Sequence, residues 1–476
     1  MSALRVAVLH YHLRPGGVTR IIEMAWAALR EQGIEVLVIS GETPPPTCRI
    51  PAGEIAVAPQ LAYGVDAGRA EALGAEIEEA MRLRWGGAAD VIHLHNHALG
   101  KNFALPLLAT KWAAEGRALV LHIHDFAENG RPANYRQLLA QLDGATRMDQ
   151  VLYPIGPRVG YAVLTAADRK KLATAGLLDC HLLPNPVSLP AGGAEVDKSL
   201  LGAERLIVYP TRAIRRKNVG EALLWATQAQ AGEKIVLTVG PHTEADLAVY
   251  RRWKALAEEL RLPIVFDAQA LTGRSTVDFL QAAEVCLTTS VVEGFGMAFL
   301  EPWMAGRPVA GRDLPGSTND FREAGVVLND LYTRLEVPVE NRAEIESAIE
   351  RAVGALCEAY QMPVTAEFGR LAVSSVFHGP QADFGRLDEA AQEAVIRRVA
   401  AGQLEVALPK TGGGTELIAS NKRAIEENYS LRSYGEKLGR IYRGLAEAKG
   451  SATGHLDAGK VLRANFGFED FFALRT

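Results

Sequence analysis

The stretch RVAVLHYHLRPGGVTRIIEMAWAALREQGIEVLVIS, residues 5–40, contains the pattern that decides the fold. Residues 5–10 are a short apolar run, and a proline with two glycines follows at 15–17. Apolar residues then recur at helical spacing over residues 21–29, and residues 34–40 form a second apolar run typical of a strand. Strand, glycine turn, helix and strand make a βαβ unit, in which functional residues lie at the carboxyl ends of the strands.

The alternation of apolar runs and polar turns continues along the chain. A stretch rich in proline and glycine at residues 184–193 divides the chain into two such series. Two successive series predict an α/β protein with two Rossmann-like, doubly wound domains that face each other across a cleft. The further runs typical of buried strands lie at 91–94, 118–123, 161–165, 205–209, 234–240, 264–266 and 285–289.

Composition and charge exclude several classes of protein. The 476 residues carry 51 Lys and Arg against 56 Asp and Glu, a net charge of −5, which argues against a main role in coating nucleic acid. No apolar run approaches the ~20 residues of a membrane-spanning helix, and the first residues lead into a strand and not into a signal peptide. The four cysteines are far apart and typical of reduced core residues. We therefore expect a cytoplasmic protein with no nucleic-acid partner, and the oligomeric state stays open.

Gly16 and Gly17 lie between the first predicted strand and the first predicted helix. Glycines let backbone N–H groups come close to an anion, and the helix dipole favours a phosphate at this end. The spacing is not the G-x-G-x-x-G of dinucleotide-binding proteins. Phosphate binding and a plain tight turn are therefore both open at this position.

A second glycine turn, EGFGMAFLE at residues 293–301, has a carboxylate at each end. We expect Glu293 in a loop and Glu301 about one turn into a helix over residues 297–304. Pro302 indicates that this helix begins late or bends. Carboxylates accept hydrogen bonds from sugar hydroxyls, and N–H groups in the turn suit a phosphate. The alternative is two acids favoured by the helix dipole.

Four cations follow the strand at 205–209 within six residues: Arg212, Arg215, Arg216 and Lys217. Arginine binds phosphate oxygens in a bidentate manner, and lysine adds a compact charge. A loop at the carboxyl end of a strand points such groups into the expected cleft. A solvated basic loop is the alternative.

The glycine turn, the Arg-x4-Lys pair and the Glu-x7-Glu motif together resemble the GT-B glycosyltransferases of family GT4. The resemblance covers roughly residues 1–330 and the helix expected over 434–448, with its lead-in Asn428-Tyr429-Ser430. It implies a first domain at residues 1–195 on the acceptor side, a second at 196–440 that binds a nucleotide-sugar, and a tail at 441–476 that packs back on the first. Residues 360–410 stay unassigned.

The family implies transfer of a sugar from a UDP-, GDP- or ADP-sugar with retention at the anomeric carbon, without a cofactor or an obligatory metal. Arg212 and Lys217 match the pair that holds the diphosphate, and Glu293 matches the acid near the donor sugar. His124 matches the histidine beside the reacting sugar, so these four are the implied catalytic residues. The implied donor-binding set is Gly16, Gly17, Arg212, Lys217, Phe295, Gly296, Met297, Ala298 and Glu301.

Seven of the eleven histidines lie before residue 125, and H-x-H patterns fall at the ends of three predicted strands. Imidazole is a common zinc or iron ligand, so a metal-dependent hydrolase is the rival interpretation. Histidines that bond to sugar hydroxyls account for the same cluster without a metal, and we favour that explanation. The seven are His10, His12, His93, His95, His97, His122 and His124.

The acceptor is expected on the first domain, near polar residues that follow the motif strands. Lys101 and Arg131 suit a carboxylate or phosphate on a small or saccharide acceptor, whereas ordinary surface solvation is equally open. The sequence has no amphipathic basic helix there, which disfavours a lipid acceptor but leaves peripheral membrane contact open. A non-catalytic nucleotide-sugar binder is a third interpretation. The acceptor candidates are His95, Asn96, Lys101, Asp125, Arg131, Asn134 and Tyr135.

Overall fold

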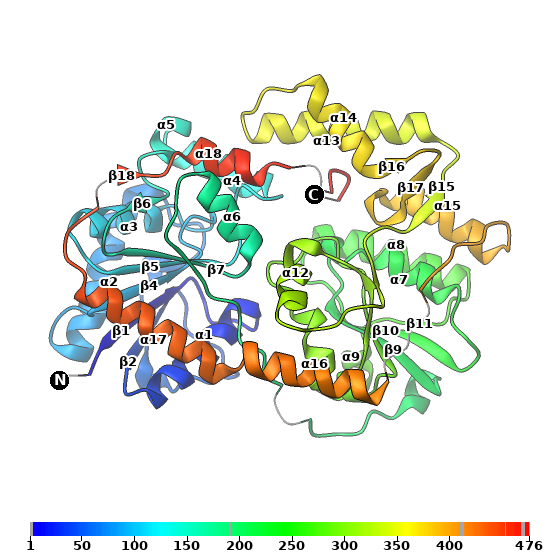
Figure 1. The fold of residues 1–476 in the computed structure, drawn as a ribbon, viewed down its shortest axis with the longest axis horizontal. Coiled ribbons are helices and arrows are strands. Elements are labelled where there is room, and N and C mark those ends of the chain that lie inside the picture. Colours follow the sequence, from blue (N-terminus) through cyan, green and yellow to red (C-terminus); the bar gives the residue numbers. More distant parts are fainter. Residues whose placement is uncertain (1–2, 190–191, 410–413, 453, 468–471, 476) are drawn as a thin grey trace. The chain divides into compact units, whose positions relative to one another are not determined.

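A computed structural model describes residues 3–189, 192–409, 414–452, 454–467 and 472–475. The chain divides into two compact units, each assembled from separated segments (Figure 1). Unit 1 comprises Met1–Pro186, Ala359–Met362 and Tyr429–Gly467, and unit 2 comprises Val187–Glu358, Pro363–Asn428 and Phe468–Thr476.

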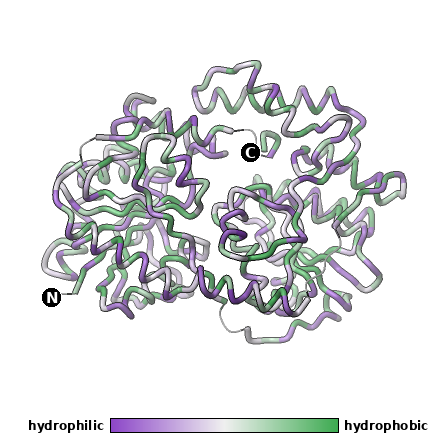
Figure 2. Tube along the Cα trace, in the orientation of Figure 1, coloured by the Kyte–Doolittle hydropathy of each residue, from purple (hydrophilic) through white to green (hydrophobic). Residues whose placement is uncertain are grey.

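Unit 1 is built on a seven-stranded sheet in which every neighbouring pair is parallel. Its strand order is β3-β2-β1-β4-β5-β7-β8. The central strands are mostly apolar, apart from histidines such as His93 and His122, because helices cover both faces of a doubly wound sheet. Figure 2 shows the largely green, hydrophobic trace along them. The strands are β1 (Arg5–His10), β2 (Glu35–Ser40), β3 (Ile55–Val57), β4 (Val91–His95), β5 (Leu119–Ile123), β7 (Val159–Val163) and β8 (Cys180–Leu182).

Helices α1 (Gly17–Glu31) and α17 (Leu431–Glu447) pack together on one face of this sheet. Ile21 and Leu29 of α1 share one core with Leu438 and Tyr442 of α17. Although about 400 residues separate the two helices, both present an apolar stripe at helical spacing. The remaining elements of unit 1 are α2 (Ala70–Trp85), α3 (Ala104–Ala114), α4 (Pro132–Gln141), α5 (Ala145–Met148), α6 (Ala166–Thr174), α18 (Ala458–Asn465), β6 (Pro154–Ile155) and β18 (Gly454–His455).

Unit 2 has a parallel sheet of six strands in the order β11-β10-β9-β12-β13-β14. Its core joins strand residues such as Leu206 and Val236 to Phe279 of α10. The strands are β9 (Arg205–Arg212), β10 (Glu233–Val239), β11 (Ile264–Val265), β12 (Val285–Thr288), β13 (Val309–Arg312) and β14 (Leu331–Tyr332), and the helices between them include α7 (Val219–Ala226), α8 (Glu244–Glu259), α9 (Ala268–Thr272), α10 (Thr276–Ala282), α11 (Glu301–Met304) and α12 (Pro315–Glu323).

The predicted class, α/β with two Rossmann-like doubly wound domains, is confirmed by these two sheets. The last long helix, α17, belongs to unit 1 along its whole length, whereas the sequence analysis placed residues up to 440 in the second domain. None of the helices in the described ranges combines the length and apolarity that crossing a bilayer requires. The four cysteines are free thiols, and three of them are buried.

In the unassigned region 360–410, residues 360–362 belong to unit 1 and the described residues 363–409 belong to unit 2. Three short antiparallel strands lie in the order β15-β17-β16. Strands of two or three residues are too short to show periodicity in a sequence. The elements within this region include α14 (Ala366–Val376), β16 (Phe377–His378), β17 (Gln381–Asp383) and α15 (Glu389–Ala400). The elements β15 (Glu336–Pro338) and α13 (Arg342–Ala359) precede it, and α16 (Thr415–Asn428) follows.

The aromatic residues near the end of the sequence pack on both units. The ring of Phe466 contacts that of Tyr360 in unit 1, with centroids 5.6 Å apart. Phe472 is buried in unit 2, where the guanidinium of Arg386 lies 4.2 Å from its ring centroid. Phe468 and Phe471 lie outside the described residues.

Each sheet has one point at which the chain order reverses. In unit 1 it lies between β1 and β4, and in unit 2 between β9 and β12. Ligands of doubly wound sheets bind beyond the carboxyl ends of the strands at such a point. The loops that follow these four strands are therefore the places where functional residues are expected.

Candidate functional site

The loops after β9 and β12 bring Lys217 and Glu293 together at the switch point of unit 2. The Lys217 ammonium donates to Oε1 of Glu293, and both side chains are largely buried. Lys217 ends the short turn Arg215–Lys217 after β9, and Glu293 lies five residues beyond the end of β12. The sequence analysis singled out both residues but did not predict that they form an ion pair.

Hydrogen bonds fix the backbone of the Lys217 loop. The Tyr209 hydroxyl on β9 and the Thr289 hydroxyl after β12 both donate to the carbonyl of Lys217, at 2.9 and 3.0 Å. The Val291 N–H donates to the carbonyl of Arg216 at 3.0 Å. The two loops are therefore held to each other on the unit 2 sheet, and the lysine is pre-positioned.

The charges of the pair are set by burial and by neighbouring cations. Burial acts to raise the pKa of Glu293, but Lys217 and Arg216 prevail and hold that pKa below its usual value. Burial lowers the pKa of Lys217, and the Glu293 carboxylate opposes this shift. The pair is thus ionised, and the ammonium retains donor capacity for a second acceptor.

The glycine turn that directly follows Glu293 in the sequence supplies backbone N–H donors. Gly296 has a φ of 99°, and a Cβ there would lie 2.8 Å from Cδ2 of Phe299. Within the described part of the chain, the N–H groups of Gly296, Met297 and Ala298 meet no acceptor. Such a nest of N–H groups binds anions.

Glu301 is the first residue of α11, and Pro302 occupies its first turn, so the helix begins later than residue 297. A separate turn, Met297–Phe299, precedes it, with Phe295 buried against Phe321 at a ring distance of 5.2 Å. The expectation of a helix over 297–304 with Glu301 a turn inside it is therefore wrong, whereas the late start that Pro302 indicated is confirmed. Proline permits the helix only from its own first turn onward.

The four cations at the end of β9 and in the turn that follows it differ in their contacts. Arg212, the last residue of β9, is exposed. Arg215 instead binds Glu389 of α15, with Nε 2.8 Å from Oε1, and donates to the carbonyl of Leu474. The expectation that all four point toward one ligand site is thus wrong for Arg215, because a buried carboxylate on α15 binds it.

A polar network under the Lys217 loop includes residues that the sequence analysis missed. Arg475 is buried and donates to Oε1 of Glu389 and to Oδ1 of Asn218, each at 2.9 Å. Asn218 directly follows Lys217 and has a φ of 51°. Burial lowers the pKa of Arg475 to about 10, and Glu389 opposes the shift. No local motif marks Arg475, because its partners are distant in sequence.

In unit 1, Gly16 and Gly17 are exposed at the beginning of α1. A Cβ at Gly17 would meet nothing within 4 Å. Neither glycine has a left-handed φ, since Gly16 has a φ of 178°. Open space and a helix N-terminus leave room for an anion, so their assignment to a phosphate stays a prediction.

His124, which directly follows β5, and His95, the last residue of β4, form a hydrogen-bonded pair in unit 1. His95 Nδ1 lies 2.8 Å from His124 Nε2. Burial lowers the pKa of His124 to about 4, and Asp125 opposes the shift. Asn96, with a φ of 56°, accepts hydrogen bonds from the N–H groups of His124 and Asp125. The structure brings these four predicted residues together.

The remaining acceptor candidates divide into two groups. Asp125 and Arg131 form a half-buried ion pair with 2.5 Å between Oδ1 and a guanidinium nitrogen, and Lys101 lies over the ring of Tyr63 at 5.7 Å. Asn134 and Tyr135 are buried on α4 instead. The Asn134 amide donates to the carbonyl of Leu99, and the Tyr135 ring lies 4.9 Å from that of Tyr360. Both have the environment of packing residues.

Comparison with known proteins shows that the fold is that of GT-B glycosyltransferases. Sucrose-phosphate synthase from Thermosynechococcus elongatus matches with a TM-score of 0.53 and 16% identity, over 92% of this chain and 98% of that chain. HepE from Anabaena, in complex with UDP and glucose, matches with a TM-score of 0.54 and 13% identity, over 92% and 99% of the two chains.

A curated relative is mannosylglucosyl-3-phosphoglycerate synthase from Petrotoga mobilis. It is 28% identical over 228 residues, which cover 44% of this chain and 43% of that protein. The match thus spans less than half the length of this relative. No protein-family model matches the chain.

Proposed function

We propose that the protein is a retaining glycosyltransferase that moves a sugar from a nucleotide-sugar to a hydroxyl of a small polar or saccharide acceptor. The observation that carries the proposal is the Lys217–Glu293 pair at the switch point of unit 2. A cation and a sugar-binding carboxylate at one such point suit a ligand that joins a diphosphate to a sugar. The GT-B fold of the chain supports this choice.

Lys217 would stabilise the charge that develops as the donor breaks. The C–O bond between the sugar and the β-phosphate breaks, the phosphate keeps the electron pair, and the acceptor oxygen bonds to the sugar carbon. The attraction between a fixed ammonium and the phosphate grows with that charge, so Lys217 lowers the barrier more than it aids ground-state binding. Exposed Arg212 and the N–H groups of Gly296 to Ala298 supply further anion donors.

Retention is proposed through attack on the face from which the diphosphate leaves, with a phosphate oxygen taking the proton of the acceptor. Glu293 would orient the sugar hydroxyls, and its pairing with Lys217 holds it ionised as an acceptor. Arg212 and Lys217 supply the charge that a divalent cation supplies elsewhere. Turnover is accordingly proposed to need no metal at the diphosphate.

Two relatives narrow the candidate substrates. HepE is described with UDP and glucose, and the name of the Petrotoga protein includes a phosphoglycerate. An anionic acceptor of that kind suits unit 1, where Lys101 and Arg131 are partly exposed cations. We therefore rank UDP-sugars first as donors and small phosphorylated or carboxylated sugars and glycerates first as acceptors.

A donor and acceptor screen tests the proposal. UDP-, GDP- and ADP-sugars are incubated with the protein, nucleotide release and product mass are measured, and thermal stabilisation by each nucleotide is recorded in parallel. We expect one nucleotide class to stabilise the protein and to give turnover, and NMR of the product to show a retained anomer. Stabilisation without turnover on any acceptor would favour a non-catalytic binder. Neither effect with any nucleotide would contradict the proposal.

A further inference from the structure

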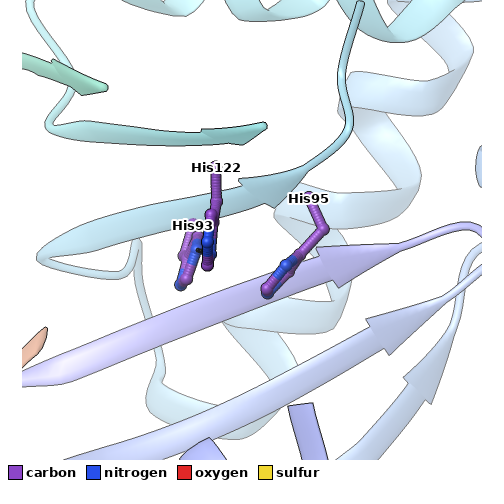
Figure 3. Close-up of side chains that lie close together, drawn as sticks. All are labelled: His93, His95 and His122. Atoms are coloured by element: carbon purple, nitrogen blue, oxygen red, sulfur yellow. Dashed lines mark hydrogen bonds between the residues drawn. The ribbon is translucent and has the colours of Figure 1, made fainter. Parts of the chain in front are cut away.

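Three histidines converge inside unit 1, a different unit from the one that carries the Lys217–Glu293 pair. His93 and His95 lie two residues apart on β4, and His122 is paired with His95 in the strand register. All three therefore project from the same face of the sheet, as Figure 3 shows. One nitrogen of each lies within 4.8 Å of the others.

Two of these imidazoles carry a nitrogen with no partner among the described residues. They are Nε2 of His95 and Nε2 of His122, and both atoms are buried. Buried polar atoms in folded proteins almost always have a partner, and exceptions often mark a bound ion or water. His93 Nε2 lies 3.2 Å from Nδ1 of His122, so these two rings are in direct contact.

The opposite nitrogens of two of these rings have outer partners. Nδ1 of His93 lies 2.6 Å from the Tyr442 hydroxyl of α17, and Nδ1 of His95 lies 2.8 Å from Nε2 of His124. Metal-bound histidines characteristically use the second nitrogen in this way, since the outer bond fixes the tautomer and the ring orientation. The cluster thus has ligand atoms inside and orienting groups outside.

We propose that His93, His95 and His122 bind one divalent transition-metal ion, with zinc as the first candidate. The three donors are neutral nitrogens with no carboxylate among them, a set that suits zinc, nickel or copper and not magnesium or calcium. His10 offers a further buried nitrogen without a partner, and its ring lies 6.0 Å from that of His95.

The ion would be structural. The three ligands are at most 1% exposed, whereas a catalytic zinc needs an open position for water or substrate. It would join β4 to β5 and, through Tyr442, to α17, which is the element that closes the unit 1 core from the far end of the sequence. The site is distinct from the diphosphate chemistry proposed for unit 2.

Ion binding would turn the rings. The His93 and His122 rings lie 19° from parallel, and those of His93 and His95 lie 26° from parallel with centroids 4.3 Å apart. Nitrogen lone pairs lie in the ring planes, so the rings must rotate before three of them reach one ion at about 2.0–2.1 Å. Because the site has no open path to solvent, we expect the ion to bind while the protein folds.

The test uses untagged protein, so that no added histidines bind metal. Metal content is measured by mass spectrometry on the purified protein. The protein is then unfolded in denaturant with a chelator and refolded with zinc, with magnesium or without metal. We expect about one tightly bound transition-metal ion per chain, and a melting temperature that zinc restores and magnesium does not. A melting temperature that is the same with and without zinc would overturn the proposal.

Two variants separate ligation from packing. His122→Gln removes a proposed ligand, and His97→Gln is the matched control, because His97 is also buried with an unpartnered nitrogen but is bonded to the carbonyl of Leu152. We expect His122→Gln to lose the ion and His97→Gln to keep it. Refolding the wild type with cobalt gives a second readout, since a tetrahedral site made by the three nitrogens and a fourth donor, for which His10 is the candidate, has a visible spectrum. Equal metal content in both variants, or no cobalt spectrum, would overturn the proposal.

Discussion

Glu128 makes the stability of unit 1 depend on pH through one buried carboxyl. The Tyr153 hydroxyl donates to Oε1 at 2.8 Å, while Oε2 has no partner among the described residues. Burial raises the pKa of Glu128 to about 7 from 4.5, and the Tyr153 hydrogen bond opposes that shift only in part. The folded protein therefore keeps a proton that the unfolded chain releases between these two values.

The upward shift of the Glu128 pKa leads to a prediction for Glu128→Gln. Wild-type stability from this group is fully present below about pH 4.5 and is lost as pH rises to about 7. The uncharged amide still accepts from Tyr153, so the variant should lose this slope and be more stable than wild type at pH 8, by up to ~3 kcal/mol. Denaturant unfolding at pH 5 and pH 8 measures this. Glu31→Gln, on the surface of α1, is the control, and an unchanged pH slope in Glu128→Gln would rule out the assignment.

Individual candidate site residues were predictable from the sequence where a local pattern marked them. Lys217 and Glu293 follow the two strands that flank the switch point of unit 2. Periodicity and turn residues were therefore enough to single them out as candidates. Arg475 and Asn218 were not found, because the hydrogen bond between them joins positions 257 residues apart. Asn134 and Tyr135 carried the same polar signal as Asp125, yet the fold buries them.

At the scale of elements, the segment 472–475 supports the loop that carries Lys217. Arg475 and Arg215 share Glu389 on α15, and Arg475 also holds Asn218. Removing one cation from this buried set leaves a carboxylate and an amide with fewer partners. Such losses cost more than the ion pair itself contributes.

We predict that Arg475→Met destabilises unit 2 by roughly 3 kcal/mol and weakens nucleotide binding, because the Lys217 loop loses its support. Arg397→Met is the matched control, since Arg397 pairs with Glu259 at the surface and such pairs contribute at most about 1 kcal/mol. Denaturant unfolding and nucleotide titration measure the two effects. Equal stability of the two variants would show that the segment does not support the loop.

The elements themselves were predictable to different degrees. The strands of both parallel sheets are apolar runs, and most were located within a few residues. The helix expected over residues 297–304 begins only at Glu301. Short antiparallel strands such as β16, with two residues, leave no pattern in a sequence.

At the scale of the whole molecule, each unit has its own sheet and its own core. The sequence order predicted two domains, and the family resemblance implied that the C-terminal part of the chain returns to the first. The return begins earlier than the expected residue 441, because all of α17 from Leu431 onward belongs to unit 1. A pairing such as Ile21 with Leu438 depends on tertiary packing and not on local propensity. Ligand effects should therefore differ between the units.

Hydrogen exchange tests that difference. We predict that the nucleotide which stabilises the protein slows exchange at residues 211–218 and 289–301 of unit 2, because a bound diphosphate occupies their N–H groups and side chains. The core strand β5 of unit 1 serves as the internal reference and should show no direct effect. Protection confined to unit 1 would contradict the placement of the donor in unit 2.

The most direct test of the central claim is the turnover of Lys217→Ala with the nucleotide-sugar that the screen identifies. Lys254→Ala is the matched control, since that lysine pairs with Asp267 on a more exposed part of unit 2. Melting curves establish that both variants are folded. The proposed role of Lys217 in neutralising the departing diphosphate predicts that its loss lowers kcat by about 10²–10³-fold and changes KM less, while the control stays near wild type. Near-normal kcat in folded Lys217→Ala would contradict it.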